Sequence, residues 1–248
     1  MIDQMYLAAQ YLAASGISFL EKKDDDSHTN LGFSVEKGSM YTRPLNNAGD
    51  TLALNYNTFA LVWNMTNANI SFDLQGTTHE EIIKWITQMA SNNGIAIPYS
   101  YKFHYEPSYK LTDGFTFKLV NPKRLRELMD FRILTQKVIA SFLKRQNLVS
   151  EIRTWPHHFD TGAFAQVPDK KELSVGLGLA IPDTLVNDHY FYLSGYLGHD
   201  TIDCSGFQPL AQGKWYPHEF KGAILPATGI NEKTATVFFQ EALKAYKN

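Results

Sequence analysis

The stretch that decides the fold class lies between residues 70 and 80 and reads Ile70-Ser71-Phe72-Asp73-Leu74-Gln75-Gly76-Thr77-Thr78-His79-Glu80. Apolar and polar residues alternate up to Leu74, which is the pattern of a strand with one buried face. The period then changes, because Thr77 and Glu80 have the spacing of a capping box and apolar residues recur every three to four positions. The stretch therefore predicts a strand followed by a helix over about residues 78–92, which Gly94 ends.

The rest of the first half places one more helix and further strands before this stretch. A helix is predicted from about residue 2 to residue 14, with Gly16 at its end. Extended segments over residues 31–43 and 52–63 follow a polar loop. Residues 95–120 are less regular and rich in tyrosine and phenylalanine, so neither a helix nor a strand is predicted there.

The second half repeats this order of elements. Asn121 and Pro122 are typical of a helix start, and the apolar residues up to about residue 146 spread wider than one stripe, which favours a helix packed on two surfaces. A last helix is predicted over residues 231–246. Between these helices lie four strand candidates, over residues 152–166, 173–180, 189–196 and 220–225.

These patterns predict an α+β fold with antiparallel sheets in two similar halves, each flanked by helices. The strand candidates are short and mostly alternating, which argues against a parallel, doubly wound sheet. We expect the first half to cover residues 1–120 and the second to cover residues 121–248, with the two closely packed as one structural unit. The order of elements suits a duplication, but residue identity between the halves is too low to establish one.

Composition narrows the function classes. The chain has 248 residues, a formal net charge of −2 and 44% apolar residues, which fits a globular core without the basic surface of a nucleic-acid binder. The single cysteine, Cys204, excludes an intrachain disulfide, and the first residues lack the positive charge of a signal peptide. Apolar stretches are too short to span a bilayer. The sequence therefore predicts a cytoplasmic protein that binds neither nucleic acid nor membrane.

The sharpest candidate for chemistry is the segment Trp155-Pro156-His157-His158-Phe159-Asp160-Thr161-Gly162. In an extended chain, His158 and Asp160 lie on the same face, and Gly162 leaves room there for a ligand. An imidazole beside a carboxylate suits general base catalysis near neutral pH. The competing interpretation is structural, with one histidine hydrogen-bonded in the core and Asp160 capping a neighbouring loop.

Two later segments supply candidate binding residues. In Asp188-His189-Tyr190-Phe191-Tyr192, alternation puts His189 on one strand face and the two tyrosines on the other. In Trp215-Tyr216-Pro217-His218-Glu219, the aromatic rings are placed to wall a pocket, although a packed turn explains them as well. Together with the first segment they predict ligand binding by Trp155, His157, His189, Tyr190, Tyr192, Trp215, Tyr216 and His218.

Metal, nucleotide and thiol chemistry have weaker support. His199, Asp200 and Asp203 are residue types that bind metals, but their spacing matches no standard zinc motif, and a polar surface loop explains them equally well. Gly176-Leu177-Gly178 begins like a dinucleotide-binding fingerprint, yet no third glycine follows in register. The glycines instead indicate a strand that another layer approaches closely. Cys204 has no neighbouring group that would make it a nucleophile.

The second half resembles an uncharacterised family, a domain of unknown function. The resemblance rests on the Phe159-Asp160 end of the aromatic segment, the glycine-bearing strand around residues 175–179, the aromatic strand from His189, and the Leu225-Pro226 strand before the last helix. In the first half it is carried by Tyr41-Thr42-Arg43-Pro44-Leu45. The family has no established activity, so the resemblance implies a fold and no mechanism.

Two function classes follow from these observations. The first is a protein that binds a small molecule or a partner without catalysis, through the aromatic face of the second half. The alternative is a small-molecule hydrolase, with or without a metal ion, that uses His158 and Asp160 as base and orienting group or as ligands. Convergence of His158, Asp160, His189 and His218 on one cleft would favour the hydrolase.

Overall fold

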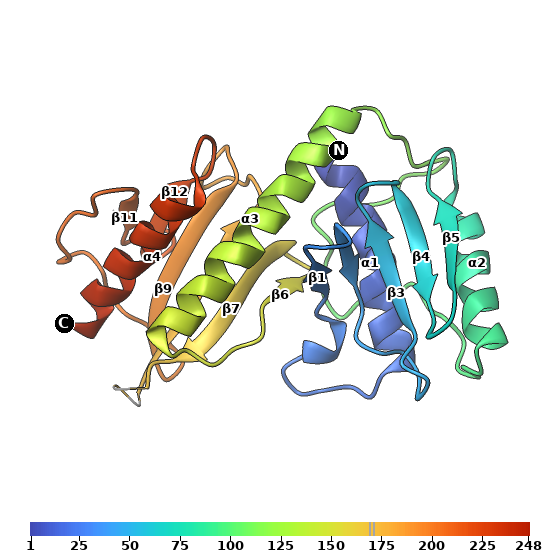
Figure 1. The fold of residues 1–248 in the computed structure, drawn as a ribbon, viewed down its shortest axis with the longest axis horizontal. Helices are drawn as coiled ribbons and strands as arrows, with labels where there is room; N and C mark the ends of the chain where they lie inside the picture. Colours follow the sequence, from blue (N-terminus) through green and yellow to red (C-terminus); the bar gives the residue numbers. More distant parts are fainter. Residues whose placement is uncertain (169, 171) are drawn as a thin grey trace. The chain divides into compact units, whose positions relative to one another are not determined.

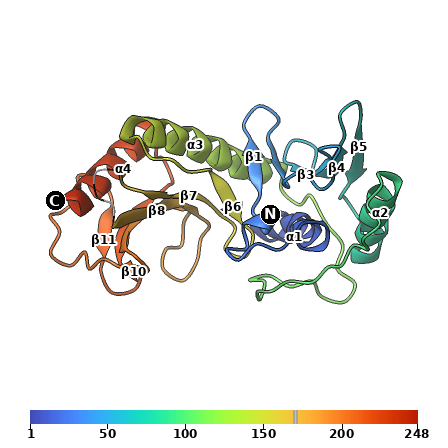
Figure 2. The ribbon, with the colours of Figure 1, turned by 90° about the horizontal axis from the view of Figure 1, so that it is seen from below.

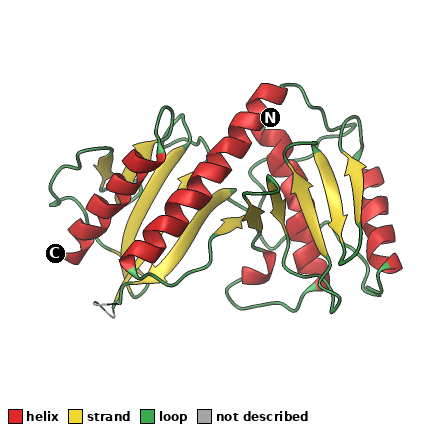
Figure 3. Cartoon of the chain, in the orientation of Figure 1, coloured by secondary structure: helices red, strands yellow, loops and turns green. Residues whose placement is uncertain are grey.

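The structure is a computed structural model that describes residues 1–168, 170 and 172–248. It has the α+β fold that the sequence predicts, with two antiparallel sheets and four α-helices among the described residues (Figures 1 and 3). The chain forms two compact units: unit 1 comprises Met1–Arg132 and Thr154–His157, and unit 2 comprises Ile133–Arg153 and His158–Asn248. The chain passes from one unit to the other inside a helix and again near residues 153–158. The predicted division at residue 120 stays a prediction.

Unit 1 is a sheet covered by helices. Its strands follow the order β1-β2-β3-β4-β5, and each pairs antiparallel with its neighbour. Figure 2 shows that α1 lies against one face of this sheet. The elements are α1 (Ile2–Phe19), a short 3₁₀ helix (Ser27–Thr29), β1 (Gly32–Ser34), β2 (Ser39–Tyr41), β3 (Thr51–Asn55), β4 (Ala60–Asn64), β5 (Asn69–Asp73) and α2 (His79–Asn92).

Helix α1 is longer than predicted, because Gly16 lies inside it. A Cβ at Gly16 would be 2.7 Å from the carbonyl oxygen of His28, so glycine is needed there for close packing of backbones. The prediction that Gly16 ends the helix is therefore wrong. Nearly the whole circumference of α1 is buried, including Tyr6 and Tyr11.

The capping box of α2 is shifted by one residue from its predicted place. The Thr78 hydroxyl accepts a hydrogen bond from the Glu81 amide at 3.3 Å, and the Glu81 carboxylate accepts one from the Thr78 amide at 2.8 Å. Thr77 is not available as the cap, because its hydroxyl donates to the carbonyl oxygen of Leu74 at 2.8 Å. Because two threonines are adjacent, the sequence allows either one to be the cap. The turn after β5 uses the Thr77 hydroxyl, so Thr78 is the cap.

Unit 2 has a sheet whose strands follow the order β11-β12-β9-β8-β7, with β10 beside β9. One face packs against helices: Phe239 of the last helix lies 5.4 Å from the Phe142 ring and 5.8 Å from the Phe191 ring, measured between centroids. The elements are the second part of α3 (Pro122–Gln146), β7 (Asp160–Gln166), β8 (Leu173–Ala180), β9 (Tyr190–Leu197), β10 (Asp200–Thr201), β11 (Lys214–Tyr216), β12 (Gly222–Pro226) and α4 (Glu232–Lys247).

The predicted single strand over residues 152–166 is wrong. The segment forms β6 (Arg153–Trp155), a turn over residues 156–159, and then β7. Phe159 closes the turn with φ +61°, in the left-handed region that β-strands exclude. Side-chain alternation therefore does not continue from His158 to Asp160, and the prediction that it places these two residues on one face is wrong.

In the part of the chain that the structure describes, no helix is both long enough and apolar enough to cross a membrane.

Candidate functional site

The most developed site in unit 1 is built by the irregular segment over residues 95–118, which we call the strap. The strap contains no helix or strand, so its backbone amides need other partners. Side chains of α1 provide them: Gln4 accepts from the Lys118 amide at 2.9 Å, Tyr6 from the Ser108 amide at 2.8 Å, and Ser18 from the Ser100 amide at 2.9 Å. Polar residues of a buried helix thus hold the strap at three points.

Tyrosines of the strap add two more hydrogen bonds to α1. The Tyr105 hydroxyl donates to Oε1 of Gln10 at 2.7 Å, and the Tyr99 hydroxyl donates to the carbonyl oxygen of Tyr11 at 3.3 Å. Burial raises the pKa of both tyrosines, so each remains a neutral phenol and keeps its donor. These bonds fix a long irregular segment in one place, which is the usual condition for a binding loop.

The middle of the strap is extended, and its side chains alternate. From Tyr101 to Lys110, half-buried residues alternate with exposed ones at every position. The half-buried set is aromatic or proline: Tyr101, Phe103, Tyr105, Pro107 and Tyr109. Ring centroids are 4.8 Å apart for Tyr101 and Phe103 and 5.2 Å apart for Phe103 and Tyr105. The strap therefore turns a row of rings towards the rest of unit 1.

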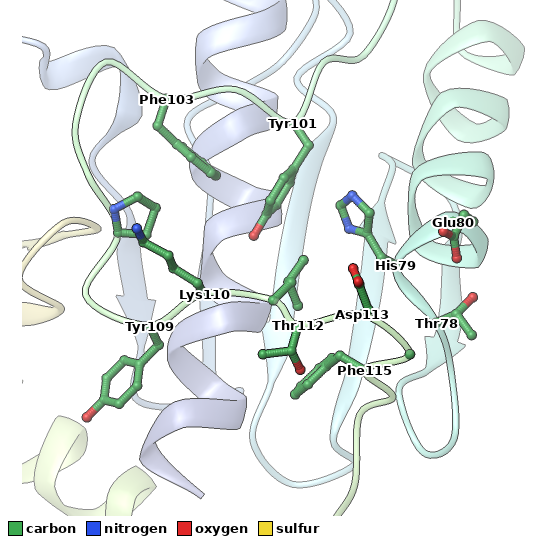
Figure 4. Close-up of a pocket in the computed structure, with 13 residues that line it drawn as sticks. Thr78, His79, Glu80, Tyr101, Phe103, Tyr109, Lys110, Thr112, Asp113 and Phe115 are labelled. Atoms are coloured by element: carbon green, nitrogen blue, oxygen red, sulfur yellow. The ribbon is translucent and has the colours of Figure 1, made fainter.

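A cavity of about 480 Å³ lies between the strap and the first turn of α2. Its aromatic wall consists of Tyr101, Phe103, Tyr109 and Phe115. Figure 4 shows His79 beside the Tyr101 ring, and the carboxylate of Asp113 pointing towards His79. A volume of this size holds a small organic molecule.

His79 is held by a hydrogen bond from beneath the cavity. The hydroxyl of Tyr11, which is fully buried, lies 2.8 Å from His79 Nδ1. Burial raises the pKa of Tyr11 and lowers that of His79, so both groups are neutral near pH 7. A buried hydroxyl needs an acceptor for its hydrogen, and His79 is the only hydrogen-bond partner of the Tyr11 hydroxyl among the described residues. The Tyr11 hydroxyl therefore donates to Nδ1, and the imidazole hydrogen remains on Nε2 as a donor.

The charges around the cavity are unbalanced. The Lys110 ammonium is bound to the Glu106 carboxylate four residues before it. Neither Glu80 nor Asp113 forms an ion pair with any described residue, and both line the cavity. The charge of Glu80 also acts on His79 and Tyr11. The site therefore combines aromatic rings, one neutral histidine and an excess of negative charge.

The residues predicted from sequence lie elsewhere, and none of them lines this cavity. His158 is exposed in the turn before β7. Asp160 begins β7, and its carboxylate accepts a hydrogen bond from the Tyr192 hydroxyl on β9. The structure thus joins Asp160 to Tyr192. The catalytic role assigned to His158 and Asp160 stays a prediction.

The space that was expected above Gly162 is filled by Tyr192. Gly162 pairs in register with Gly178, and Gly178 with Tyr192. An added Cβ would meet the Tyr192 hydroxyl at 3.0 Å from Gly162 and at 2.7 Å from Gly178. The prediction that Gly162 leaves room for a ligand is therefore wrong. The glycines let the Tyr192 side chain reach Asp160, and the close approach comes from this side chain and from the backbone of the paired strand, not from another layer.

The remaining predicted binding residues do not share one surface. Tyr190 and Tyr192 lie on the sheet face opposite the helices, as alternation predicted, and the Tyr190 hydroxyl donates to Asp183 at 2.7 Å. His189 is buried with 3% of its surface exposed. In unit 1, the half-buried Trp155 ends β6, and the His157 ring lies 5.6 Å from the Tyr105 ring of the strap.

The segment around Trp215 is a hairpin. Trp215 on β11 faces the helices, with its ring 5.6 Å from that of Tyr246, and its Nε1 donates to the carbonyl oxygen of Gln208 at 2.9 Å. Tyr216 pairs with Gly222 on the opposite face. His218 is exposed in the turn between β11 and β12. Both aromatic-Pro-His segments, Trp155-Pro156-His157 and Tyr216-Pro217-His218, thus lead from a strand into a turn.

Metal and thiol chemistry gain no support from the side-chain arrangement. No group of three or more histidine, cysteine or acidic residues suited to a metal occurs among the described residues. Cys204 has only 1% of its surface exposed, and burial raises the pKa of its thiol. This agrees with the prediction that Cys204 is not an activated nucleophile.

Comparison with known proteins adds no relative. No family model matches the chain, no curated protein is similar to it at a significant level, and no solved structure matches its fold. The resemblance to a family of unknown function, drawn from short motifs, stays a prediction. Function has to be argued from the site alone.

The strap is not among the sites predicted above, although the sequence contains its signal. Residues 101–110 read Tyr101-Lys102-Phe103-His104-Tyr105-Glu106-Pro107-Ser108-Tyr109-Lys110. Aromatic or apolar residues occupy every second position, which indicates an extended segment with one buried face. Proline and the absence of valine and isoleucine argue against a central strand. An extended segment that buries rings without pairing as a strand is the arrangement observed.

Proposed function

We propose that this protein binds a small molecule in the strap cavity of unit 1 and acts by binding without catalysis. One observation carries the proposal: an irregular segment is fixed to α1 by side-chain hydrogen bonds, and an aromatic-walled cavity of about 480 Å³ opens beside it. Loops of this length without secondary structure are uncommon in compact domains unless they serve binding or catalysis.

The polar groups in the cavity support binding more than catalysis. With Nδ1 of His79 accepting from Tyr11, the imidazole offers a hydrogen and no lone pair to the cavity. A general base needs a free lone pair, so His79 suits recognition of a hydrogen-bond acceptor. The aromatic wall supplies contact area, and His79 and Asp113 supply orientation.

A fragment screen by ligand-observed NMR tests the proposal. Compounds that bind the wild-type protein are tested again with Phe103→Ala, which removes one ring of the cavity wall. Phe164→Ala is the matched control, because Phe164 is a half-exposed ring on unit 2 with 51% of its surface exposed. We expect hits that lose binding in Phe103→Ala and keep it in Phe164→Ala. A screen without hits, or hits that Phe103→Ala leaves unchanged, would refute the proposal.

A further inference from the structure

We propose that the ligand of the strap cavity is a small organic cation, either a protonated amine or a quaternary ammonium compound. The inference rests on the proposed function and adds the chemical class of the ligand. It follows from the charges and the rings that line the cavity, taken together.

Charge decides against an anion. Two carboxylates, those of Glu80 and Asp113, line the cavity without an ion pair among the described residues. The one basic residue of the lining, Lys110, is already neutralised by Glu106. His79 adds no positive charge near pH 7, because burial lowers its pKa. An anion would therefore meet repulsion without a free cation to offset it.

The helix start does not reverse this balance. The first turn of α2 has positive amide ends, which can attract anions. Here Glu80 and Glu81 follow the cap, and the Glu81 carboxylate already accepts from the amide and hydroxyl of Thr78 at 2.8 Å and 3.0 Å. The Glu81 carboxylate thus already accepts from the amide and hydroxyl at the start of α2.

The rings favour a cation over a neutral molecule. Tyr101, Phe103, Tyr109 and Phe115 present π systems, whose faces attract positive charge. Burial raises the pKa of Tyr101, so its ring carries a neutral hydroxyl. Aromatic cages are the usual way in which proteins bind quaternary ammonium groups. The donor on His79 would then contact an oxygen of the ligand at some distance from its charge.

Three probes of equal shape separate the alternatives. The first is choline, the second is the neutral alcohol in which carbon replaces the choline nitrogen, and the third is the carboxylate with the same branched carbon skeleton. Binding is followed by NMR shifts of the strap amides and the His79 ring. We expect choline to bind about tenfold more tightly than the neutral alcohol, which is the range of a cation–π contact in a partly desolvated site, and the carboxylate to bind most weakly.

Variants assign the effect to the cavity. Asp113→Asn removes one charge without changing the shape, and we expect choline affinity to fall about fivefold. Asp24→Asn is the control, because it changes net charge equally from an exposed position outside the cavity. Phe103→Leu keeps an apolar side chain without a π face, so it should weaken choline and leave the neutral alcohol unchanged.

The outcomes separate this inference from the proposed function. If the neutral alcohol or the carboxylate binds as tightly as choline, the cavity is a binding site and the cation inference is wrong. If no probe binds while fragments do, the inference is wrong and the proposed function stands. If neither probes nor fragments bind, both fail. Choline binding that is insensitive to Asp113→Asn and Phe103→Leu also overturns the inference.

Discussion

The strap of unit 1 and the open sheet face of unit 2 are both rich in tyrosine, and they use it in opposite ways. In unit 1 the Tyr6 hydroxyl accepts a hydrogen bond from the backbone of the strap, and the Tyr105 hydroxyl donates one to a buried side-chain amide. A cavity remains beside these rings. In unit 2 the Tyr192 side chain reaches over Gly162 and Gly178, and it fills the space that the glycines leave. A row of aromatic residues therefore predicts a pocket only where the backbone beside it is not a regular, glycine-bearing sheet.

This comparison predicts different sensitivities in the two units. The sheet face has no spare volume, so added atoms should be costly there. The strap depends on individual hydrogen bonds, so removal of a single hydroxyl should matter there while added volume matters less.

Gly178→Ala is expected to have the largest effect. The new Cβ would lie 2.5 Å from the carbonyl oxygen of Thr161 and 2.7 Å from the Tyr192 hydroxyl, closer than real contacts allow. We expect the free energy of unfolding to fall by about 2–3 kcal/mol in urea denaturation, because Tyr192 and the sheet have to move apart.

Gly176→Ala is the matched control on the same strand. A Cβ at Gly176 meets nothing nearer than the Tyr196 ring at 3.4 Å, so its cost should be small. Equal losses in the two variants would show that the glycines are not needed for the position of Tyr192.

Tyr192→Phe is expected to have the next largest effect. The variant removes the hydroxyl that donates to the Asp160 carboxylate, and hydrogen bonds to charged groups contribute about 1.5–3 kcal/mol. We expect a loss in that range by urea denaturation. Tyr196→Phe is the control, because the Tyr196 hydroxyl makes no hydrogen bond with the described residues.

The result also bears on the hydrolase hypothesis. A clear loss in Tyr192→Phe assigns Asp160 a structural role, which agrees with a structural interpretation of this residue more than with catalysis. An unchanged stability would count against this structural role and would favour the hydrolase again.

The sequence predicts regular elements in this protein better than it predicts the site. The fold class and the helices near residues 78–92, 122–146 and 231–246 follow from hydrophobic periodicity, and the structure confirms them. Periodicity is the spacing of apolar residues within a short window of the chain, so it is a local property.

The site depends on contacts that are distant in sequence. Gln4 and Lys118 are separated by 114 positions, and Tyr11 and His79 by 68. In the first helix these polar residues look like ordinary surface positions, and nothing local shows that a strap will cover them. The segment from Trp155 was wrongly predicted as one strand, because Phe159 adopts a left-handed conformation that ends the alternation. Phenylalanine is seldom found in that conformation, so the sequence does not indicate it.

Tyr6→Phe tests the strap at a single point. The Tyr6 hydroxyl accepts from the Ser108 amide at 2.8 Å and donates to the carbonyl oxygen of His157 at 3.3 Å. We expect stability to fall by about 1 kcal/mol and the Ser108 amide to exchange faster in hydrogen-exchange NMR.

Tyr109→Phe is the control for this variant, because the Tyr109 ring packs 5.1 Å from the Tyr6 ring and its hydroxyl has no partner among the described residues. If the strap amides exchange equally in both variants, the bonds from α1 do not hold the strap.

The smallest expected effect is a pH dependence that arises from two histidines of unit 1. Burial lowers the pKa of His28 and of His79 in the folded protein. Below the ordinary histidine value of about 6.5, the unfolded chain therefore binds protons that the folded chain does not, and stability falls as pH falls. The decline should begin above the range in which carboxylates protonate.

Urea denaturation between about pH 7 and pH 5 checks this, together with NMR titration of the histidine rings. His79→Gln should flatten the decline, because glutamine does not titrate, and His28 should contribute to what remains. A His79 ring that titrates at or above the ordinary value would contradict the prediction. It would also place a positive charge beside Asp113 near neutral pH, and the cavity would then be less favourable to a cation.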